Sequence, residues 1–436
     1  MRRVSILTAL AIALTLAAGP LAPSLRAQNS KPASRTVGPY TVTTVVDGLD
    51  FGWGLAFLPG GDMLITELKG TLRRVHNGVL DPKPVAGVPA VFPEPYGGLM
   101  DVVLHPDFAK NQFVYLSYNK SGPALPPGVK TMGQRLELGY SPSGPRPELQ
   151  RLTSTLAVAR GRWNGTDLVD TKEIFVADDW KDQSVPSTTA SRIVFARDGS
   201  MYVSVGGANA PASAGKLAGA QGGVAQDPAR DGGKVLRLKD DGTIPKDNPF
   251  VGKKGYKPEI YTMGHRNTIG MAMHPETGAI WVNENGPLDG DEINILKPGA
   301  NYGWPLVGMG REYLGDFIGG PGAVGPTAGR KDAYKMYMEG MEQPFIFWTP
   351  TVSPSGMTFY TGDKFPNWKG SLLVAELKGS RIERFVFNEK GGQPRREALF
   401  TELKQRLRAV YQGPDGYLYV LTDGKPGQLL KIERTQ

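Results

Sequence analysis

The residues best suited to chemistry lie in one acidic stretch, Glu284–Pro305, which reads ENGPLDGDEINILKPGANYGWP. It holds carboxylates at Glu284, Asp289, Asp291 and Glu292 among several glycines and prolines, and it contains no histidine or cysteine. Calcium takes six to eight oxygen ligands from carboxylates and carbonyls and tolerates irregular geometry. The composition therefore suits calcium, although a Gly-Asp-Glu stretch is also a common turn.

A group of cations forms a second candidate site. Arg406 and Arg408, in QRLRAV, are two residues apart, so in a strand their side chains point to the same side. Each guanidinium can hold a carboxylate through two parallel hydrogen bonds. Together these groups suit an anionic small ligand, whereas an Arg-x-Arg strand taken alone is more often a solvated face.

The elements that must position these residues follow from a hairpin pattern that occurs six times. An alternating apolar strand, a turn rich in Pro, Asp and Gly, and a second apolar strand recur along the chain. Six such units in about 400 residues leave room for four strands each, which predicts an all-β, six-bladed β-propeller of four-stranded antiparallel blades. A pair of β-sandwiches would not explain one signature repeated six times. The hairpins are Gly54–Thr66, Asp101–Tyr118, Arg192–Val205, Gly270–Asn283, Gly356–Leu377 and Ala409–Thr422.

The N-terminal part of the chain predicts export. Two arginines precede the apolar run Ile6–Ala18, which is too short to span a bilayer comfortably. We expect residues 1–27 to be a signal peptide, residues 28–39 a flexible segment and residues 40–436 the propeller domain. Later stretches are not apolar enough for a membrane span, so we expect a protein of the periplasm.

Composition excludes several classes of protein. The 436 residues include no cysteine, which excludes cysteine zinc sites, iron–sulfur clusters and covalent c-type haem. The formal net charge is +8, but the positive residues are dispersed, so we expect no nucleic-acid binding. With 57 glycines, 36 prolines and 40% hydrophobic residues, the chain has the composition of a turn-rich β protein rather than a disordered one.

Longer motifs connect these features. The chain contains, in this order, GGLMDVVLHPDFAKNQFVYLSY, GKVLRLKDDGTIPKDNPF, GHRNTIGMAMHP, NGPLDGDEINILKPGANYGWP, SGMTFYTGDKFPNW and RLRAVYQGPDGYLYVLTD. From about Tyr40 to the C-terminus, it resembles the soluble PQQ-dependent glucose and aldose sugar dehydrogenases of the glucose/sorbosone dehydrogenase family. The resemblance implies a six-bladed propeller that binds calcium and pyrroloquinoline quinone (PQQ), an ortho-quinone with three carboxylates. It also implies the oxidation of a hydroxyl group of a sugar or other alcohol.

The resemblance assigns roles to particular residues. Arg266, Asn267, Lys378, Arg406 and Arg408 match positions that bind the quinone. The arginine that matches Arg266 lies by the reactive carbonyl, where it would stabilise the negative charge that develops on oxygen.

Four further positions match calcium ligands of the family. The backbone carbonyls of Gly286 and Pro287 would hold the calcium that anchors the cofactor, and this ion would polarise the quinone as a Lewis acid. Glu292 and Tyr302 would help to hold further structural calcium. Because the chain has no cysteine for its own haem c, electrons would pass to a separate acceptor. Members of the family can dimerise, and the sequence leaves the oligomeric state open.

The sequence departs from the family on the substrate side. The histidine that serves as general base in the family is replaced by Thr188, whose neutral hydroxyl cannot act as a base near pH 7. Other replacements make the expected substrate pocket more apolar: Tyr96, Gly206, Gly207, Ile269 and Asn285.

Two residues are candidates for the missing base. His265 adjoins Arg266, although the family has this histidine too, beside a different base. Glu376 lies two residues before Lys378, and burial would raise its pKa while the neighbouring cation would lower it. We expect that one of the two takes the proton.

Two other functions remain open on the sequence. The first is a propeller that binds the cofactor but has lost dehydrogenase activity. The second is a calcium-dependent, lactonase-like propeller hydrolase, in which metal-bound water attacks an ester. That hydrolase needs several side-chain carboxylates and an asparagine that converge on the central channel, whereas here the acids cluster in one loop.

Overall fold

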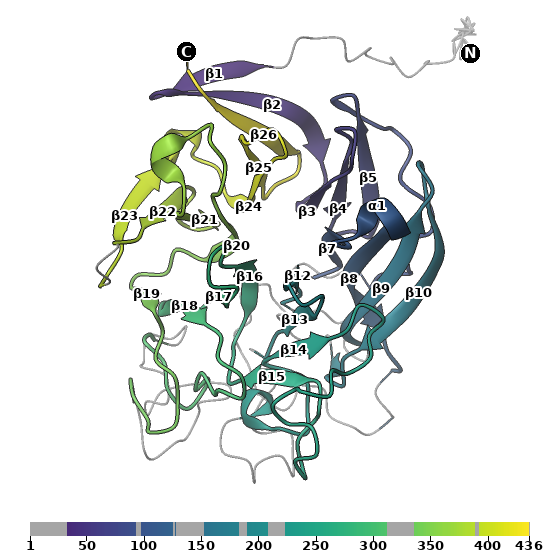
Figure 1. Cartoon of the computed structure of the whole chain (residues 1–436), viewed down its shortest axis with the longest axis vertical. Helices are drawn as coiled ribbons and strands as arrows, with labels where there is room; N and C mark the ends of the chain where they lie inside the picture. The colour runs from purple at the N-terminus through teal and green to yellow at the C-terminus, as the bar shows by residue number, and fades with distance from the viewer. Residues whose placement is uncertain are drawn as a thin grey trace, which may run out of the picture.

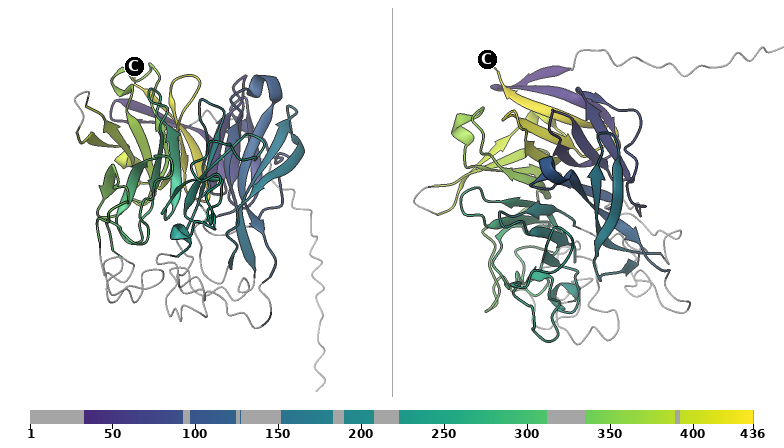
Figure 2. Two further views of the ribbon diagram at one scale, coloured as in Figure 1. Left: turned by 60° about the horizontal axis from the view of Figure 1, so that its bottom comes forward. Right: turned by 45° about the vertical axis from the view of Figure 1, so that its right-hand side comes forward.

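The computed structural model describes residues 33–92, 97–124, 127, 152–182, 190–207, 223–311, 335–388 and 392–435. Within these ranges six small antiparallel sheets form a ring, which is a six-bladed β-propeller (Figure 1). The left view of Figure 2 shows the strands of neighbouring blades side-on, standing upright next to one another. Helix is limited in these ranges to α1 (Phe108–Asn111) and a few 3-10 turns, and no described helix is long and apolar enough to cross a membrane.

Within each sheet the strands follow one another outwards from the central channel. The innermost strands, which number the blades from 1 to 6, are β3 (Gly52–Phe57), β7 (Leu99–Leu104), β12 (Ile193–Phe195), β16 (Thr268–Met273), β20 (Pro354–Phe359) and β24 (Leu407–Gln412). The second strands are β4 (Met63–Glu67), β8 (Phe113–Ser121), β13 (Met201–Val205), β17 (Ile280–Glu284), β21 (Leu372–Glu376) and β25 (Leu418–Thr422). The third strands are β5 (Thr71–His76), β9 (Thr153–Trp163), β14 (Lys234–Leu238), β18 (Asp291–Ile295), β22 (Ile382–Val386) and β26 (Gly427–Arg434). The outermost strands are β6 (Val79–Leu80), β10 (Leu168–Val176), β15 (Ile260–Met263), β19 (Ile346–Trp348), β23 (Arg395–Leu399) and β2 (Tyr40–Leu49).

The predicted fold class is confirmed, and each predicted hairpin is the innermost pair of strands of one blade. The inner strands are buried on both faces because neighbouring blades pack against them. Strand β21, for example, reads LLVAE and is buried at all five positions. Apolar residues can therefore fill both faces of such a strand, rather than alternating strictly with polar ones.

The sequence pattern did not show how the ring closes. Blade 6 combines both ends of the chain, because β2 pairs with β26 from Tyr40↔Arg434 to Leu49↔Gly427. Strand β1 (Ser34–Val37) adds to the outer edge of β2, so part of the segment expected to be flexible, residues 28–39, is a strand. The predicted signal peptide, residues 1–27, lies outside the described residues.

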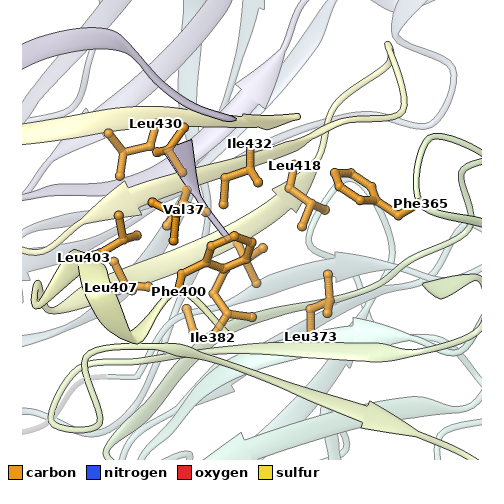
Figure 3. Packing of buried hydrophobic residues seen from close by; sticks show 14 of the residues in the cluster. Val37, Phe365, Leu373, Ile382, Phe400, Leu403, Leu407, Leu418, Leu430 and Ile432 are labelled. Atoms are coloured by element: carbon orange, nitrogen blue, oxygen red, sulfur yellow. The ribbon is translucent and has the colours of Figure 1, made fainter. Parts of the chain in front are cut away.

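Apolar side chains between adjacent blades hold the ring together. Figure 3 shows one such interface, in which Val37 from β1 lies close to Leu430 from β26 and Phe400 from blade 5. Each large apolar side chain that is removed from water contributes about 1.5–3 kcal/mol to folding. Because this cluster joins both termini to blade 5, it stabilises the closed ring.

One buried arginine connects the blades across the central channel. Arg192, which directly precedes β12, forms an ion pair with Asp101 of β7 at 3.0 Å. Its Nε donates to the carbonyl oxygen of Ile269 in β16 at 2.9 Å, and its Nη1 donates to the hydroxyl of Tyr411 in β24 at 3.3 Å. Blades 2, 3, 4 and 6 thus meet at one guanidinium.

The same guanidinium also contacts the remaining two blades. It stacks on the ring of Trp53 in β3, at 4.0 Å from the ring centroid. In β20, a Cβ atom at Gly356 would lie 2.8 Å from Arg192 Nη2, so only glycine leaves room for the guanidinium. Arg192 therefore contacts all six blades and crosses the channel just below the point where the innermost strands begin.

Candidate cofactor site

The five predicted quinone-binding residues come from three consecutive blades and lie at one end of the propeller. Arg266 and Asn267 directly precede β16, Lys378 follows β21, and Arg406 and Arg408 lie at the start of β24. Strands β20 and β21 are antiparallel, with Pro354 opposite Glu376, so the end of β21 lies beside the start of β20. Because β16, β20 and β24 are adjacent innermost strands, the four cations surround the same mouth of the channel.

Asp423 holds the arginine pair. Arg408 donates to Asp423 Oδ1 through Nε at 3.2 Å and through Nη2 at 2.5 Å, whereas Arg406 donates to Oδ2 at 2.8 Å. Burial by itself raises the pKa of Asp423, but the two guanidinium groups hold it below its usual value. Arg406 is half-exposed and Arg408 is mostly buried. Since one carboxylate serves two arginines, the cluster keeps a net positive charge.

Lys378 lies on a tight turn after β21, and this turn is hydrogen-bonded to the connection between β19 and β20. The side chain is exposed, and within the described part of the chain its ammonium forms no hydrogen bond or ion pair. The backbone N–H groups of Lys378 and Gly379 both donate to the carbonyl oxygen of Val352 at 3.0 Å. The ammonium is therefore available to an anion while its backbone is fixed.

Arg266 is aimed at the backbone of the acidic loop. Its Nη1 donates to the carbonyl oxygens of Asn285 at 2.8 Å and Gly286 at 2.7 Å, and its guanidinium lies 5.3 Å from the ring centroid of Trp304. Asn267 donates through Nδ2 to Asn285 Oδ1 at 3.1 Å, while its own Oδ1 is buried and has no hydrogen-bond partner among the described residues. This pair of residues fixes the loop that contains the predicted calcium-binding carbonyls.

The carboxylates of the acidic loop do not converge on one point. Asp289 pairs with Arg311 at 2.9 Å, Asp291 accepts hydrogen bonds from the backbone, and Glu284 pairs with His265. Within the described ranges no three His, Asp or Glu side chains are close enough together to hold a metal ion. Calcium at Gly286 and Pro287 would therefore depend on backbone carbonyls and on the ligand itself.

Glu292 lies directly opposite Glu284 in the β17–β18 pair. Both carboxylates accept a hydrogen bond from Asn294 Nδ2, at 3.1 and 2.9 Å respectively. Burial and then the charge of Glu284 raise the pKa of Glu292 to about 8. Two adjacent carboxylates thus share one amide donor, and the structural calcium expected at Glu292 stays a prediction.

His265 and Tyr302 form a closed structural unit. The two rings stack with centroids 4.7 Å apart, and the Tyr302 hydroxyl donates to the carbonyl of Ile295 at 2.7 Å. His265 is fully buried, with Nδ1 3.0 Å from Glu284 Oε1 and Nε2 2.9 Å from Thr262 Oγ1. Since a carboxylate can only accept, Nδ1 donates to Glu284, and Nε2 forms its hydrogen bond with Thr262. His265 therefore has no lone pair available for a substrate proton.

Glu376 is also buried, beneath the turn that carries Lys378. It forms an ion pair with Arg381 Nε at 2.9 Å, and a Cβ atom at Gly379 would collide with its Oε2. Burial raises the pKa of Glu376 to about 9, and the neighbouring Glu383 adds to the effect. The raised pKa favours the protonated form of this carboxyl at neutral pH.

The substrate side is described only in part. Thr188 and Tyr96 lie outside the described residues. Ile269 packs with Ala190 and Leu377 in a small buried apolar cluster that joins blades 3, 4 and 5. The polar residue that the family has at the position of Ile269 is thus replaced by part of an apolar wall.

Sequence reasoning missed the carboxylate of Asp423, and it named Asp291 without finding the segment that Asp291 holds. Asp423 directly follows β25, and its N–H donates to the carbonyl of Arg406 at 2.8 Å, so counting the hairpin register from Leu407 opposite Thr422 could have found it. Asp291 had no such signal, because its partners at Thr351–Ser353 are 60 residues away and precede another blade.

Comparisons with known proteins show the family to which the chain belongs. The family model described as Glucose / Sorbosone dehydrogenase matches residues 49–431. Aldose sugar dehydrogenase YliI of Escherichia coli is 37% identical over 398 residues, which cover 90% of this chain and 93% of the relative. Quinoprotein glucose dehydrogenase B of Acinetobacter calcoaceticus is 28% identical over 85% of this chain and 82% of its own.

A solved structure of a relative contains the cofactor. The PQQ-bound form of aldose sugar dehydrogenase from Streptomyces coelicolor has a TM-score of 0.61 at 25% identity, and the match covers 92% of this chain and 99% of that one. The chain belongs to the glucose/sorbosone dehydrogenase family, and its named relatives are sugar dehydrogenases.

Proposed function

We propose that the protein is an exported, PQQ- and calcium-dependent dehydrogenase that oxidises a hydroxyl group of a sugar or other alcohol. The convergence of Arg266, Lys378, Arg406 and Arg408 on one mouth of the channel carries this proposal. PQQ has three carboxylates, and bidentate guanidinium contacts together with an exposed ammonium suit them. Bound PQQ would supply the two-electron acceptor for the carbon–hydrogen bond beside the hydroxyl.

The residues at the mouth of the channel would have different roles in binding and in catalysis. Arg408 and Arg406, oriented by Asp423, would hold carboxylates, and Lys378 would hold another. Arg266 would stabilise negative charge that develops on the reactive oxygen. The carbonyls of Gly286 and Pro287 would hold calcium, with Glu292 and Tyr302 at a further calcium. Arg192 lies across the channel below the site, and substrate and product would use the mouth at which the four cations lie.

For the proton of the hydroxyl, we propose Glu376 rather than His265. Both ring nitrogens of His265 are occupied, whereas Glu376 has a pKa raised to about 9 and would accept a proton in alkaline solution. The rate kcat/KM should therefore rise with pH towards 9, and Glu376→Gln should abolish turnover while PQQ still binds. A profile that is flat above neutral pH, or a Glu376→Gln variant with normal turnover, would exclude Glu376.

Electrons would leave for a separate acceptor, because the chain has no cysteine for a covalent haem. A hydrolase of the lactonase kind is less well supported, since the described residues hold no cluster of carboxylates in the channel. The leader sequence supports export, and a homodimer remains open to measurement.

One experiment tests the proposed function. The protein without residues 1–27 is titrated with PQQ in the presence of Ca²⁺, and dye reduction is then measured with a panel of aldoses and secondary alcohols. Tight binding with reduction, lost with EDTA or in Arg408→Ala, is the expected result. Binding without reduction would indicate a cofactor-binding protein that lacks activity. Product formation without any electron acceptor would indicate a hydrolase.

A further inference from the structure

Among the residues that the structure describes, Asp291 is a buried carboxylate held by neutral donors alone. It is fully buried at the start of β18, and no Lys, Arg or His nitrogen of the described residues lies within ion-pair distance of it. Its Oδ1 accepts the N–H of Gly286 at 2.9 Å. Its Oδ2 accepts the Thr351 hydroxyl at 2.5 Å and the N–H groups of Val352 and Ser353, both at 2.8 Å.

The two oxygens of Asp291 therefore hold two different segments. Oδ1 fixes the loop with the predicted calcium-binding carbonyls, and Oδ2 fixes the connection that leads into blade 5. The carbonyl of Val352 then accepts the N–H groups of Lys378 and Gly379 at 3.0 Å. An unbroken chain of hydrogen bonds joins Gly286 to Lys378 through one carboxylate.

The chain continues beyond Gly286. The carbonyl oxygen of this residue accepts a hydrogen bond from Arg266 Nη1 at 2.7 Å. Both peptide groups of Gly286 are thus constrained, the N–H side by Asp291 and the carbonyl side by Arg266. Two cations from different blades, Arg266 and Lys378, share one rigid support.

We propose that Asp291 is the positioning residue that couples Lys378 to the calcium-binding carbonyl of Gly286 in the cofactor site. The inference rests on the proposed function, because it concerns how the same site binds PQQ and calcium. A buried carboxylate without a cation is unfavourable. A divalent cation on the neighbouring carbonyl would compensate this charge, so Asp291 favours calcium at that position while it holds Lys378 in place.

The test compares two carboxylates of the same loop. Asp289 is also buried, but among the described residues its carboxylate binds only Arg311 and does not contact the 351–353 connection. In Asp291→Asn, the amide presents N–H groups to backbone donors, so the PQQ dissociation constant at saturating Ca²⁺ should rise about tenfold or more. Asp289→Asn should change it by less than about threefold, and thermal melts show how much each variant loses in stability.

A double-mutant cycle separates positioning from general destabilisation. In the otherwise unchanged protein, Lys378→Ala should weaken PQQ binding by about tenfold. In the Asp291→Asn background the same change should have an effect of less than about threefold, because Lys378 is then no longer held in place. Purely additive effects would show that Asp291 does not act through Lys378 and would overturn the inference.

A measurement without cofactor completes the test. Hydrogen–deuterium exchange of the protein before PQQ is added should show faster exchange at residues 351–353 and 377–379 in Asp291→Asn, and unchanged exchange there in Asp289→Asn. If Asp291→Asn does not fold, Thr351→Val takes its place, because this variant removes one donor and keeps the carboxylate. PQQ binding in the double-mutant cycle and hydrogen–deuterium exchange are then measured on Thr351→Val in the same way.

The outcomes distinguish the inference from the function on which it rests. If the unmodified protein binds PQQ and Asp291→Asn binds it equally well, the inference is overturned and the proposed function stands. If the unmodified protein does not bind PQQ, both are overturned. Weaker binding in Asp291→Asn, non-additivity with Lys378→Ala and faster exchange in both segments together support the inference.

Discussion

At the residue scale, the two arginines on Asp423 should contribute unequally to PQQ binding. Arg408 is mostly buried and makes two hydrogen bonds to the carboxylate, whereas Arg406 is half-exposed and makes one. A fixed guanidinium loses less freedom on binding than a mobile one. We expect Arg408→Ala to weaken PQQ binding by about a hundredfold and Arg406→Ala by about tenfold or less, measured by titration. Equal losses would contradict the unequal roles.

Glu376 should make the folding stability depend on pH. Its pKa is raised to about 9 in the folded state from an ordinary 4.5, so the folded protein retains a proton that the unfolded chain releases. This contribution is complete below pH 4.5 and is lost as pH rises towards 9, so stability falls across that window. In Glu376→Gln the slope should flatten, and the free energy of unfolding at pH 8 should rise by about 1–3 kcal/mol.

Urea denaturation at pH 6 and pH 8 measures this difference, with Glu397→Gln as a control on the outer strand of the same blade. Equal pH dependence in Glu376→Gln and the unmodified protein would show that Glu376 is not the group responsible. The same variant separates the two roles of the residue, because loss of turnover with a gain in stability fits a group that is kept for chemistry rather than for folding.

Residue spacing predicted part of the site. The i, i+2 spacing of Arg406 and Arg408 predicted one shared face, and both side chains do bind one carboxylate. The partner of His265 could not be predicted, because Glu284 follows it by 19 residues and meets it only when β16 and β17 pair. The same holds for Asp291, whose contacts depend on how blade 4 packs against blade 5.

At the scale of elements, β1 and β2 should differ in importance. Strand β1 forms hydrogen bonds along one edge only and is mostly exposed, whereas β2 lies between β1 and β26. Removal of residues 1–38 should lower the melting temperature by only about 2–4 °C. Removal of residues 1–50 should abolish the cooperative transition, because β26 would become an open edge. Thermal denaturation followed by circular dichroism compares the two, and a cooperative melt of the shorter chain would contradict the role of β2.

The hairpin pattern predicted the inner half of each blade but not the outer half. Inner hairpins have short turns and apolar strands, as in GLAFLPGGDMLIT, and local sequence is enough to recognise them. Outer strands such as β6 (Val79–Leu80) and β19 (Ile346–Trp348) are short and pair at an exposed edge. Closure by β2 joins residues nearly 400 positions apart, and no local pattern encodes it.

At the scale of the whole molecule, Arg192 should be among the most important residues for stability. Its guanidinium contacts every blade, and removing it leaves Asp101 as a buried charge without its partner. Breaking a buried ion pair in this way costs about 3–5 kcal/mol. We expect Arg192→Ala to lower the free energy of unfolding by this amount in urea titrations.

The double variant Arg192→Met with Asp101→Leu removes both charges and should be less destabilised than Arg192→Ala. This comparison separates the charge from the size of the side chain. A destabilisation of Arg192→Ala below about 1 kcal/mol would show that the ring does not depend on this contact.

The closure of the ring through β2 also sets an order of events during synthesis. The ten residues of β2 leave the ribosome among the first, but their partner β26 is among the last segments to be made. Until then the edge of β2 that pairs with β26 is open to aggregation or to binding by a chaperone. A nascent chain that ends between residues 423 and 426 carries five complete sheets and a sixth blade that still lacks β26. Quality control can therefore distinguish complete from incomplete chains by this single exposed strand.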